Sequence, residues 1–560
     1  MNKHLLISVL LAGCASLPVF GQSAIDGFML SQPDMKGTAR FMSMGGAFGA
    51  LGGDLTTLSQ NPAGIGVYRS HEIGFTLNLD VQQSTSDAQG FKTTDRQTKF
   101  LLNNIGGVAS LKLNSSTFPN FNFGFTYNKA SSFNRRYKGA VPVLSNSMSN
   151  YVAGMSNSEG LALDQVQGSD AYNPPSGYGA PWLSILGFDG YLITPQGNLD
   201  SPHWTGQWGS GTSGAGAFGV EEKGHVDEYN IALGGNIANV VYWGMDFGII
   251  DLDYSLNSVW GEDLRGAYVD DNNQGLARTT AQWNLQNLYS ASGNGFNYKL
   301  GVIVKPIQEL RIGFAFHTPT WYNIDEQYAA RINYKYGLDY IRGDNVETNG
   351  GVPGSNSYNF RTQWRLIASV AGVIGNKCII SADYEWSSYN QMHFSYSDND
   401  DYYYGDYGYP DYPYYSQTRS SLNPQNDPFY LTNKDIKDYY QTSHTFRLGA
   451  EYRVTPHFSV RAGYSFTTSP VKEKVRDNQV DIYTSGTNPS YRFNNTTYYI
   501  TCGLGYRVKR FYVDLAYVHK HLSSDWHAYT PDTQNPSIPS PQAKLSLNNS
   551  QIVLSAGLRF

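Results

Sequence analysis

Short segments in which apolar and polar residues alternate recur along the whole chain. Near the C-terminus one face of such a segment carries Ile552, Leu554, Ala556, Leu558 and Phe560, and the other carries Gln551, Ser555, Gly557 and Arg559. The period of two is that of a β-strand. Around Phe446 and Phe458 the polar face includes Arg447, Glu451 and Arg461. Charges opposite an aromatic face predict a lipid-facing exterior around a polar interior.

About fourteen such segments can be counted, an even number that lets an antiparallel barrel close with both termini on one side. They cover residues 71–87, 98–113, 118–137, 226–239, 240–260, 288–305, 310–335, 357–375, 377–396, 443–455, 458–469, 495–508, 511–529 and 544–560. The predicted fold class is therefore all-β: a transmembrane antiparallel β-barrel.

The connections between these segments alternate between short and long. The short ones are 114–120, 306–309, 375–376, 455–457 and 509–510, and the longest are 138–225 and 397–442. Short turns on one rim and long loops on the other are typical of a bacterial outer-membrane barrel. The terminal Phe560 resembles the C-terminal signal that the barrel-assembly machinery recognises, so this machinery is a predicted partner, as are outer-membrane lipid and lipopolysaccharide.

Composition excludes several other classes. A net charge of -6 gives no basic excess for binding nucleic acid. The longest nearly uncharged apolar run after the N-terminus, 366–374, is about half of the roughly 20 residues that a membrane-spanning helix needs. An inner-membrane helical transporter is thereby excluded. Cys378 and Cys502 form no metal-ligand cluster, and we expect no metal site and no cofactor.

The N-terminus resembles an export signal. Lys3 precedes an apolar stretch from Leu5 to Phe20, and small or branched residues end at Gly21. Residues 1–21 are thus predicted to be a signal peptide, with a mature chain that begins near Gln22. A second interpretation makes Cys14, in the sequence LAGC, the acylated first residue of a lipoprotein. Both interpretations agree with a bacterial outer-membrane location.

The segment before the first strand is unusually rich in Gly and Ala. Residues 37–54 read GTARFMSMGGAFGALGGD, and residues 61–64 read NPAG. Here the chain resembles the FadL/TodX family of outer-membrane transport proteins. The resemblance implies that residues 22–65 form a small hatch, or plug, inside the barrel, and that residues 66–560 form the barrel itself. The hatch motif residues are Gly45, Gly46, Asn61, Pro62 and Ala63, the last three as its anchoring turn.

Five arginines are predicted to point into the lumen: Arg311, Arg365, Arg447, Arg461 and Arg507. One interpretation is that they donate hydrogen bonds to hatch carbonyls or to Asp54. The alternative is that they line a wet channel together with acidic residues of the wall, namely Asp383, Glu385, Glu451 and Asp514. The sequence leaves both interpretations open.

The long loop at 138–225 contains an apolar cluster. Its members are Trp182, Leu183, Ile185, Leu186 and Phe188. Because the resembled family captures ligands on its long loops, the cluster is a possible ligand-capture site. A lid that packs against itself is the equally weighted alternative.

The sequence contains no catalytic constellation, so we expect no enzyme. The resemblance implies passive uptake of hydrophobic compounds, such as long-chain fatty acids or aromatic hydrocarbons, with capture on extracellular loops and lateral release through the barrel wall. A structural or docking barrel of a secretion system is one alternative. A haem receptor using His519, His521 and His527 is another.

Overall fold

A computed structural model describes most of the chain. It covers residues 22–560 except 169, 175–178, 271–274, 342–343, 376, 397–428, 485 and 532–539. The predicted signal peptide and most of the predicted loop 397–442 therefore lie outside the described residues.

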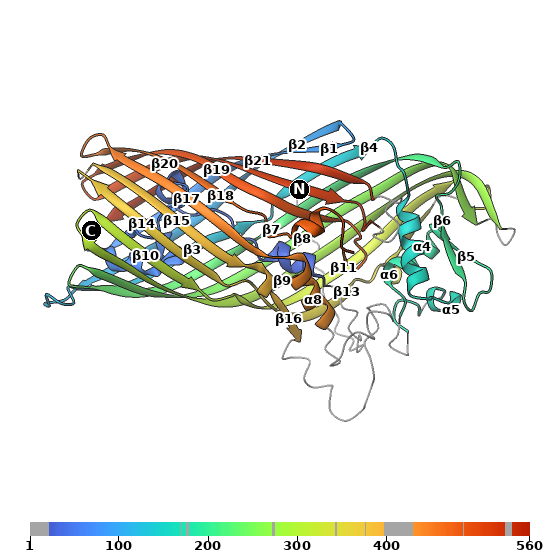
Figure 1. Cartoon of the computed structure of the whole chain (residues 1–560), viewed down its shortest axis with the longest axis horizontal. Coiled ribbons are helices and arrows are strands. Elements are labelled where there is room, and N and C mark those ends of the chain that lie inside the picture. Colours follow the sequence, from blue (N-terminus) through green and yellow to red (C-terminus); the bar gives the residue numbers. More distant parts are fainter. Residues whose placement is uncertain are drawn as a thin grey trace, which may run out of the picture.

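A closed antiparallel barrel of 14 strands forms the body of the molecule (Figure 1). In chain order the barrel strands are β1 (Glu72–Ala88), β2 (Phe91–Lys112), β3 (Asn120–Ser132) with β4 (Arg135–Val141), β7 (Ser213–Ile237), β8 (Val241–Asp270), β9 (Leu276–Ile307), β10 (Leu310–His317) with β11 (Trp321–Tyr336), β13 (Gly354–Arg361) with β14 (Arg365–Ile374), β15 (Cys378–Ser388) with β16 (His393–Tyr396), β17 (Thr442–Arg453), β18 (Phe458–Thr467), β19 (Tyr491–Val508), β20 (Phe511–His527) and β21 (Gln542–Arg559). The last strand pairs with the first, from Glu72↔Arg559 to Asp87↔Lys544, which closes the barrel. The predicted fold class is confirmed.

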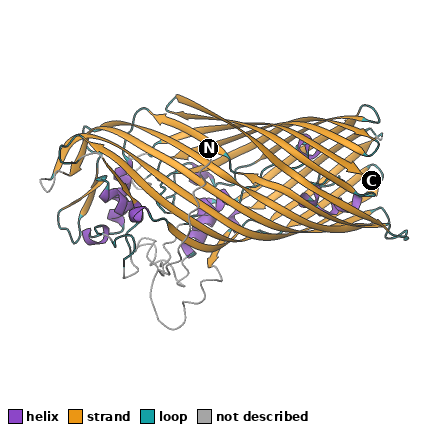
Figure 2. Cartoon of the chain, turned by 180° about the vertical axis from the view of Figure 1, so that it is seen from behind, coloured by secondary structure: helices purple, strands orange, loops and turns teal. Residues whose placement is uncertain are grey.

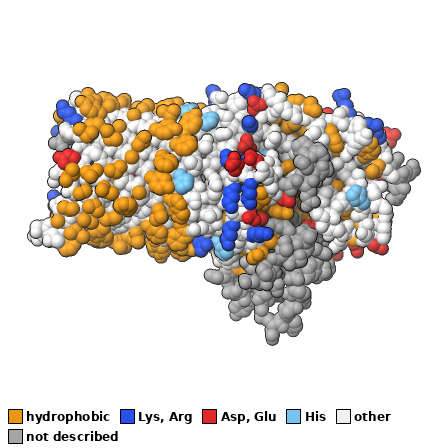
Figure 3. Space-filling model, in the orientation of Figure 1, with side chains coloured by type: hydrophobic (Ala, Val, Ile, Leu, Met, Phe, Trp, Pro, Cys, Tyr) orange, Lys and Arg blue, Asp and Glu red, His pale blue; other side chains and the backbone are white. Residues whose placement is uncertain are grey.

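Exposed apolar side chains cover the half of the barrel next to the short turns (Figure 3). We call this surface the apolar belt; Phe75, Phe446, Leu515 and Leu554 belong to it and are each more than 40% exposed, whereas Val553, which points inward, is fully buried. The alternation in the sequence thus reflects a lipid-facing side and an inward side of each strand.

The strands extend beyond the belt, which the sequence did not indicate. The predicted loop 138–225 is shorter, because β4 ends at Val141 and β7 begins at Ser213. This first part of β7 reads SGAGAFG and offers few large apolar residues on its outer face. Beyond the belt the outer face meets water, so apolar alternation is no longer needed and the pattern that identifies a strand disappears.

Short elements lie beyond the apolar belt, on the side away from the short turns. They are α4 (Met148–Ser158), α5 (Leu163–Val166), α6 (Trp182–Asp189), β5 (Ile193–Gln196), β6 (His203–Gly206), β12 (Asp344–Glu347), η2 (Thr348–Gly351), η3 (Tyr389–Gln391), α8 (Tyr430–Tyr439) and α9 (Glu473–Arg476). Among the described residues no helix is long and apolar enough to cross a membrane.

The N-terminal segment, residues 22–67, lies inside the barrel (Figure 2). It contains α1 (Ala24–Leu30), α2 (Ala39–Ser43), α3 (Thr57–Gln60) and η1 (Pro62–Val67). Glycines of the wall make room for its backbone. A methyl group on Gly244 would overlap the Pro62 carbonyl, one on Gly301 the Asn61 side chain, and one on Gly463 the Gly45 amide. These inward glycines therefore fit the wall to the segment.

We predict that Gly463→Ala displaces the N-terminal segment while the barrel persists. The added methyl group meets backbone atoms of Met44 and Gly45, and overpacking of this kind costs about 1–3 kcal/mol, equivalent to a roughly 5- to 150-fold larger open population. Limited proteolysis should cut the segment correspondingly faster. Gly372→Ala is the control, because nothing lies within 4 Å of its added methyl group; equal cleavage of both variants would contradict the prediction.

Candidate functional site

The glycine-rich motif forms a tightly folded floor across the lumen. Gly45 and Gly46 have φ values of 63° and 75°, a region that favours glycine. The side-chain oxygen of Asn61 caps η1 by accepting a hydrogen bond from the Ala63 backbone amide (3.1 Å). The side-chain NH2 group of Asn61 donates to the Gly49 carbonyl (2.5 Å). Pro62 is the first residue of η1. The Asn-Pro-Ala turn thus ties the two halves of the motif together.

The wall holds this floor mainly through Asp383 of β15. One of its carboxylate oxygens accepts hydrogen bonds from the amides of Phe48 (3.0 Å) and Gly49 (2.9 Å) and from the Gln60 side chain (3.2 Å). Arg311 donates to the Leu51 carbonyl at 2.7 Å. Asp383 and Arg311 therefore anchor the N-terminal segment to β15 and β10, two strands that are separated by β14.

The other predicted lumen arginines contact the wall rather than the segment. Arg365 and Arg447 both donate to Glu385 at 2.6 Å, and Arg461 bridges Glu451 and Asp514, also at 2.6 Å. Arg507 shares the inward face of β19 with Gly503 and is exposed near the turn. Arg311 thus contacts a carbonyl of the segment, whereas Arg365, Arg447 and Arg461 form ion pairs with acidic residues of the wall.

Asp54 takes its partners from within the segment. Its carboxylate accepts hydrogen bonds from the Thr38 hydroxyl (2.7 Å) and the Thr56 amide (3.0 Å). Burial raises the pKa of Asp54. An arginine of the segment itself, Arg40 of α2, also joins it to the wall by donating to Glu451 at 3.0 Å.

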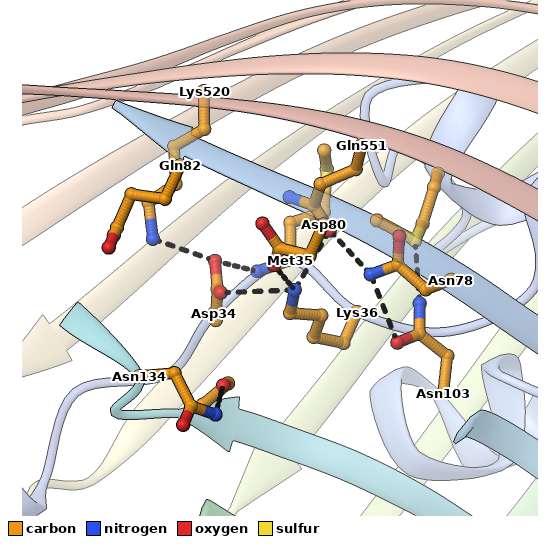
Figure 4. Close-up of polar contacts among 12 residues, drawn as sticks. Asp34, Met35, Lys36, Asn78, Asp80, Gln82, Asn103, Asn134, Lys520 and Gln551 are labelled. Carbon is orange, nitrogen blue, oxygen red and sulfur yellow. Dashed lines mark hydrogen bonds and ion pairs between the residues drawn. The ribbon is translucent and has the colours of Figure 1, made fainter. Parts of the chain in front are cut away.

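A buried ion-pair cluster fixes the segment at a second level (Figure 4). We call Asp34, Lys36, Asp80 and Lys520 the Asp34 cluster. Asp34 contacts Lys520 (2.9 Å) and Lys36 (3.7 Å), and Lys36 contacts Asp80 (3.2 Å). Burial alone raises the pKa of Asp34, but the ammonium groups of Lys520 and Lys36 outweigh it and hold this pKa below its usual value. The segment is thus joined to β1 and β20 by charges.

The barrel wall divides beside this cluster. β2 pairs with β1 along Phe91–Val108 but with β3 only along Asn104–Lys112. The third barrel strand breaks at residues 133–134, where Phe133 turns inward and packs edge-on against Tyr254. Beyond the break, β4 pairs with β7 alone. Residues 91–103 of β2 therefore pair with no other described residue on their second side; we call this the wall gap.

The wall gap begins within the apolar belt and is spanned by side chains farther out. Phe100 and Leu102, which are 68% and 37% exposed, lie on its β2 side. Arg136 of β4 reaches Asp95 of β2 at 2.7 Å. The N-terminal segment lies behind the gap, since the Asp34 amide donates to the Ala130 carbonyl of β3 at 3.1 Å. The segment thus satisfies part of the β3 edge that β2 leaves open.

Two cavities adjoin the gap from inside. One of about 260 Å³ is lined by residues 129–131 of β3, and one of about 20 Å³ by Ser132, Asn134 and Arg135 together with Asp34. The larger cavity has both apolar and charged residues in its lining. Its apolar lining includes Phe28, Leu30, Val226, Ile250, Tyr322 and Leu522, and its charged lining includes Lys299, Glu228, Arg365, Glu385 and Arg447.

The apolar cluster of the predicted capture loop is packed into a core of its own. Trp182, Leu183, Ile185 and Leu186 are at most 4% exposed, and Phe188 packs against the same core. This arrangement matches the self-packed alternative rather than an open groove. The three histidines of the haem-receptor alternative have different surroundings. His519 and His521 contact Ser550 and Asn548, whereas His527 is buried and stacked on Tyr491.

Comparison with known proteins identifies the family. Residues 212–510 match the model of the outer membrane protein transport protein family (OMPP1/FadL/TodX). The chain belongs to this family. Its predicted relationship is thereby confirmed, and it is an outer-membrane transport protein. No curated protein sequence matches the chain.

A solved structure of a FadL homologue has the same fold, and two further solved structures are similar to the chain over most of its length. A FadL homologue from Pseudomonas aeruginosa is 12% identical, with coverage of 95% of this chain and 100% of that chain and a TM-score of 0.50. The toluene transporter TbuX from Ralstonia pickettii is also 12% identical (94% and 99% covered, TM-score 0.44), and TodX from Pseudomonas putida is 11% identical (94% and 99% covered, TM-score 0.45).

Sequence reasoning missed the Asp34 cluster and the wall gap of this FadL/TodX-family protein. Asp34 and Lys36 lie in an irregular stretch before the recognisable motif. Lys520 lies on the same face of its strand as Asp514, so the alternation does indicate that it points inward, but it gives no sign of its partner. A signal for the gap did exist, because SSFNRR interrupts the alternation at residues 131–136. It was included in one continuous predicted strand, 118–137.

We predict that Asp34→Asn destabilises the folded protein by about 3–5 kcal/mol, because it leaves buried Lys520 without an anionic partner. Urea unfolding in lipid vesicles would measure the difference. Since the pKa of Asp34 is lowered in the folded state, its contribution is fully present above the usual value of 3.8 and is lost as the pH falls through the folded value. The difference between the two proteins should therefore shrink in acid.

Lys223→Gln serves as the matched control for this charge change. Lys223 pairs with Glu221 on the surface, with side-chain exposures of 54% and 35%, so we expect a change of less than about 1 kcal/mol. If the two variants lose equal stability, the Asp34 cluster does not anchor the segment.

Proposed function

We propose that this protein is a channel for passive uptake of hydrophobic compounds, with long-chain fatty acids and aromatic hydrocarbons as candidate substrates, and that it releases them laterally through the wall gap. The single observation that carries the proposal is the separation of β2 from β3 and β4 within the apolar belt, with cavities directly behind it.

Backbone chemistry makes the gap a functional feature of the wall. An unpaired strand edge is unfavourable where it meets hydrocarbon, because its amides and carbonyls have no water to bind. A closed ladder would satisfy these groups at no cost, and the break at residues 133–134 prevents it. Interruptions of strand pairing are common next to functional sites.

The polarity of the larger cavity favours a sideways exit. An apolar molecule that enters from the end opposite the short turns contacts Phe28 and Tyr322 first. Val226 lies opposite Ser131 at the gap. Continuing toward the short turns would bring it against Arg365, Glu385 and Arg447, where burying it would strip water from charges. A sideways route avoids these three charges and passes Lys129 and the Asp34 cluster, which must move when the route opens.

The N-terminal segment acts in this proposal as the hatch, residues 22–65. It covers the inner side of the gap, where Asp34 bonds to Ala130 and the Asn103 side chain donates to the Gly37 carbonyl. Opening the route then requires residues near Asp34 to move, whereas Gly45, Gly46, Asn61, Pro62 and Ala63 keep the floor in place. Ligand capture by the Trp182 to Phe188 cluster would require that loop to open first.

Uptake in proteoliposomes tests the proposal. Vesicles with purified full-length protein should take up radiolabelled toluene or oleate faster than protein-free vesicles, without nucleotide. If neither compound enters faster through protein that is folded by heat-modifiability, the proposed substrate classes are wrong.

Closure of the gap tests the lateral route. Cysteines at Asp95 and Arg136, in a background with Cys378→Ser and Cys502→Ser, should be joined by a cleavable bis-methanethiosulfonate linker, because the native side chains meet at 2.7 Å. We expect the linked protein to lose most of its uptake and to regain it on reduction. Each single cysteine with the same reagent is the control. Unchanged uptake in the fully linked protein would exclude the lateral route.

A further inference from the structure

Two short helices lie side by side at the outer edge of the apolar belt. α8 directly precedes β17, and α9 follows β18. Tyr440 and Val471 form an antiparallel bridge, and the Lys472 amide donates to the Tyr439 carbonyl at 2.9 Å. The Lys472 ammonium group donates to the Lys437 carbonyl at 2.6 Å. The helices therefore form one surface.

This surface is basic. We define the basic patch as Lys434, Lys437, Lys472, Lys474 and Arg476; Lys472 is half-buried and the others are exposed. The same helices also carry Asp438, Glu473 and Asp477 on their accessible faces, so the cations outnumber these acids. In the orientation shared by Figures 1 and 3, Lys and Arg side chains gather around α8, beside the edge of the belt.

The patch cations differ from those inside the barrel in their partners. Lys36, Lys299, Arg447 and Arg461 each form an ion pair with a carboxylate. Within the part of the chain that the structure describes, no patch cation lies within 4.0 Å of a carboxylate oxygen, the limit for an ion pair. Their charge is available to an external anion.

The depth of the patch matches that of lipid head groups. Phe446, 50% exposed in the belt, lies only a few residues beyond Thr442, the first residue of β17, a distance of about 13 Å along an extended strand. Between them His444 stacks on Tyr384 (5.9 Å between ring centroids), in the position of the aromatic girdle that borders the hydrocarbon layer. A lipid whose acyl chains contact the belt therefore places its head group against α8 and α9.

We propose that the basic patch binds the phosphate groups of a glycolipid of the outer leaflet. Clustered Lys and Arg at a membrane surface attract anionic head groups, and several cations share each multiply charged phosphate. The acyl chains add contacts with the belt that free phosphate lacks. The patch cations lie on the accessible side of α8 and α9 and are distinct from the wall gap, which lies at β2, whereas the buried side of α8 packs against α1.

Titration of the purified full-length protein with diphosphorylated lipid A in detergent tests this site. The patch variant carries Lys437→Gln, Lys472→Gln, Lys474→Gln and Arg476→Gln; the matched control carries Lys377→Gln, Arg453→Gln, Lys509→Gln and Arg510→Gln, exposed cations at the short-turn end. We expect binding at least tenfold weaker in the patch variant and unchanged in the control, with binding by the natural protein weakening as salt rises. Heat-modifiability checks folding, and Lys437→Gln with Lys472→Gln is a milder second variant.

Two further probes decide whether the lipid phosphate is what binds. Dephosphorylated lipid A should bind at least tenfold more weakly than the diphosphorylated form, and inorganic phosphate should not compete at equal concentration. Equal binding by the patch variant and the natural protein, equal binding of dephosphorylated lipid A, or full competition by inorganic phosphate would each overturn the proposal. Hydrocarbon uptake into lipid A-free vesicles should be retained by the patch variant.

Discussion

Backbone hydrogen bonding in a medium without water is the constraint on which this structure depends. Each strand within the hydrocarbon layer must pair on both sides, and the pairing of β21 with β1 completes the circle. This closure also decides the side-chain chemistry, because successive residues of each strand face lipid and lumen in turn. The arginines, carboxylates and glycines of the inner face then become the surface on which the N-terminal segment folds.

The same constraint explains why the region around residues 133–134 matters. Where β2 and β3 part, the barrel gives up ladder hydrogen bonds that it forms elsewhere around its circumference. The N-terminal segment returns one of them through the Asp34 amide, and the Arg136 to Asp95 ion pair spans the wider part. The wall is thus completed there by contacts that can be broken singly, which a continuous ladder does not allow.

Much of the fold was predictable because the belt imposes a period of two on the sequence. Ile552, Leu554 and Phe446 revealed their strands, and the Gly/Ala-rich motif with Asn61 and Pro62 identified the family. Prediction failed in the parts of the strands that lie beyond the apolar belt. The first half of β7 and the tail of β8 pass beyond the lipid and carry few large apolar residues on their outer face, so their sequences resemble loops. Partners such as Asp34 and Lys520, 486 residues apart, leave no local pattern at all.

The lumen-filling position of the N-terminal segment restricts the order in which the chain is assembled. Only residues 68–71 separate η1 from β1, and β1 is one of the two strands that meet at the final seam. The wall glycines Gly244, Gly301 and Gly463 fit the segment too closely for it to slide in along a finished wall. This close fit favours an order of assembly in which the sheet closes around a segment that is already in place. The N-terminal segment then guides the pairing of β21 with β1.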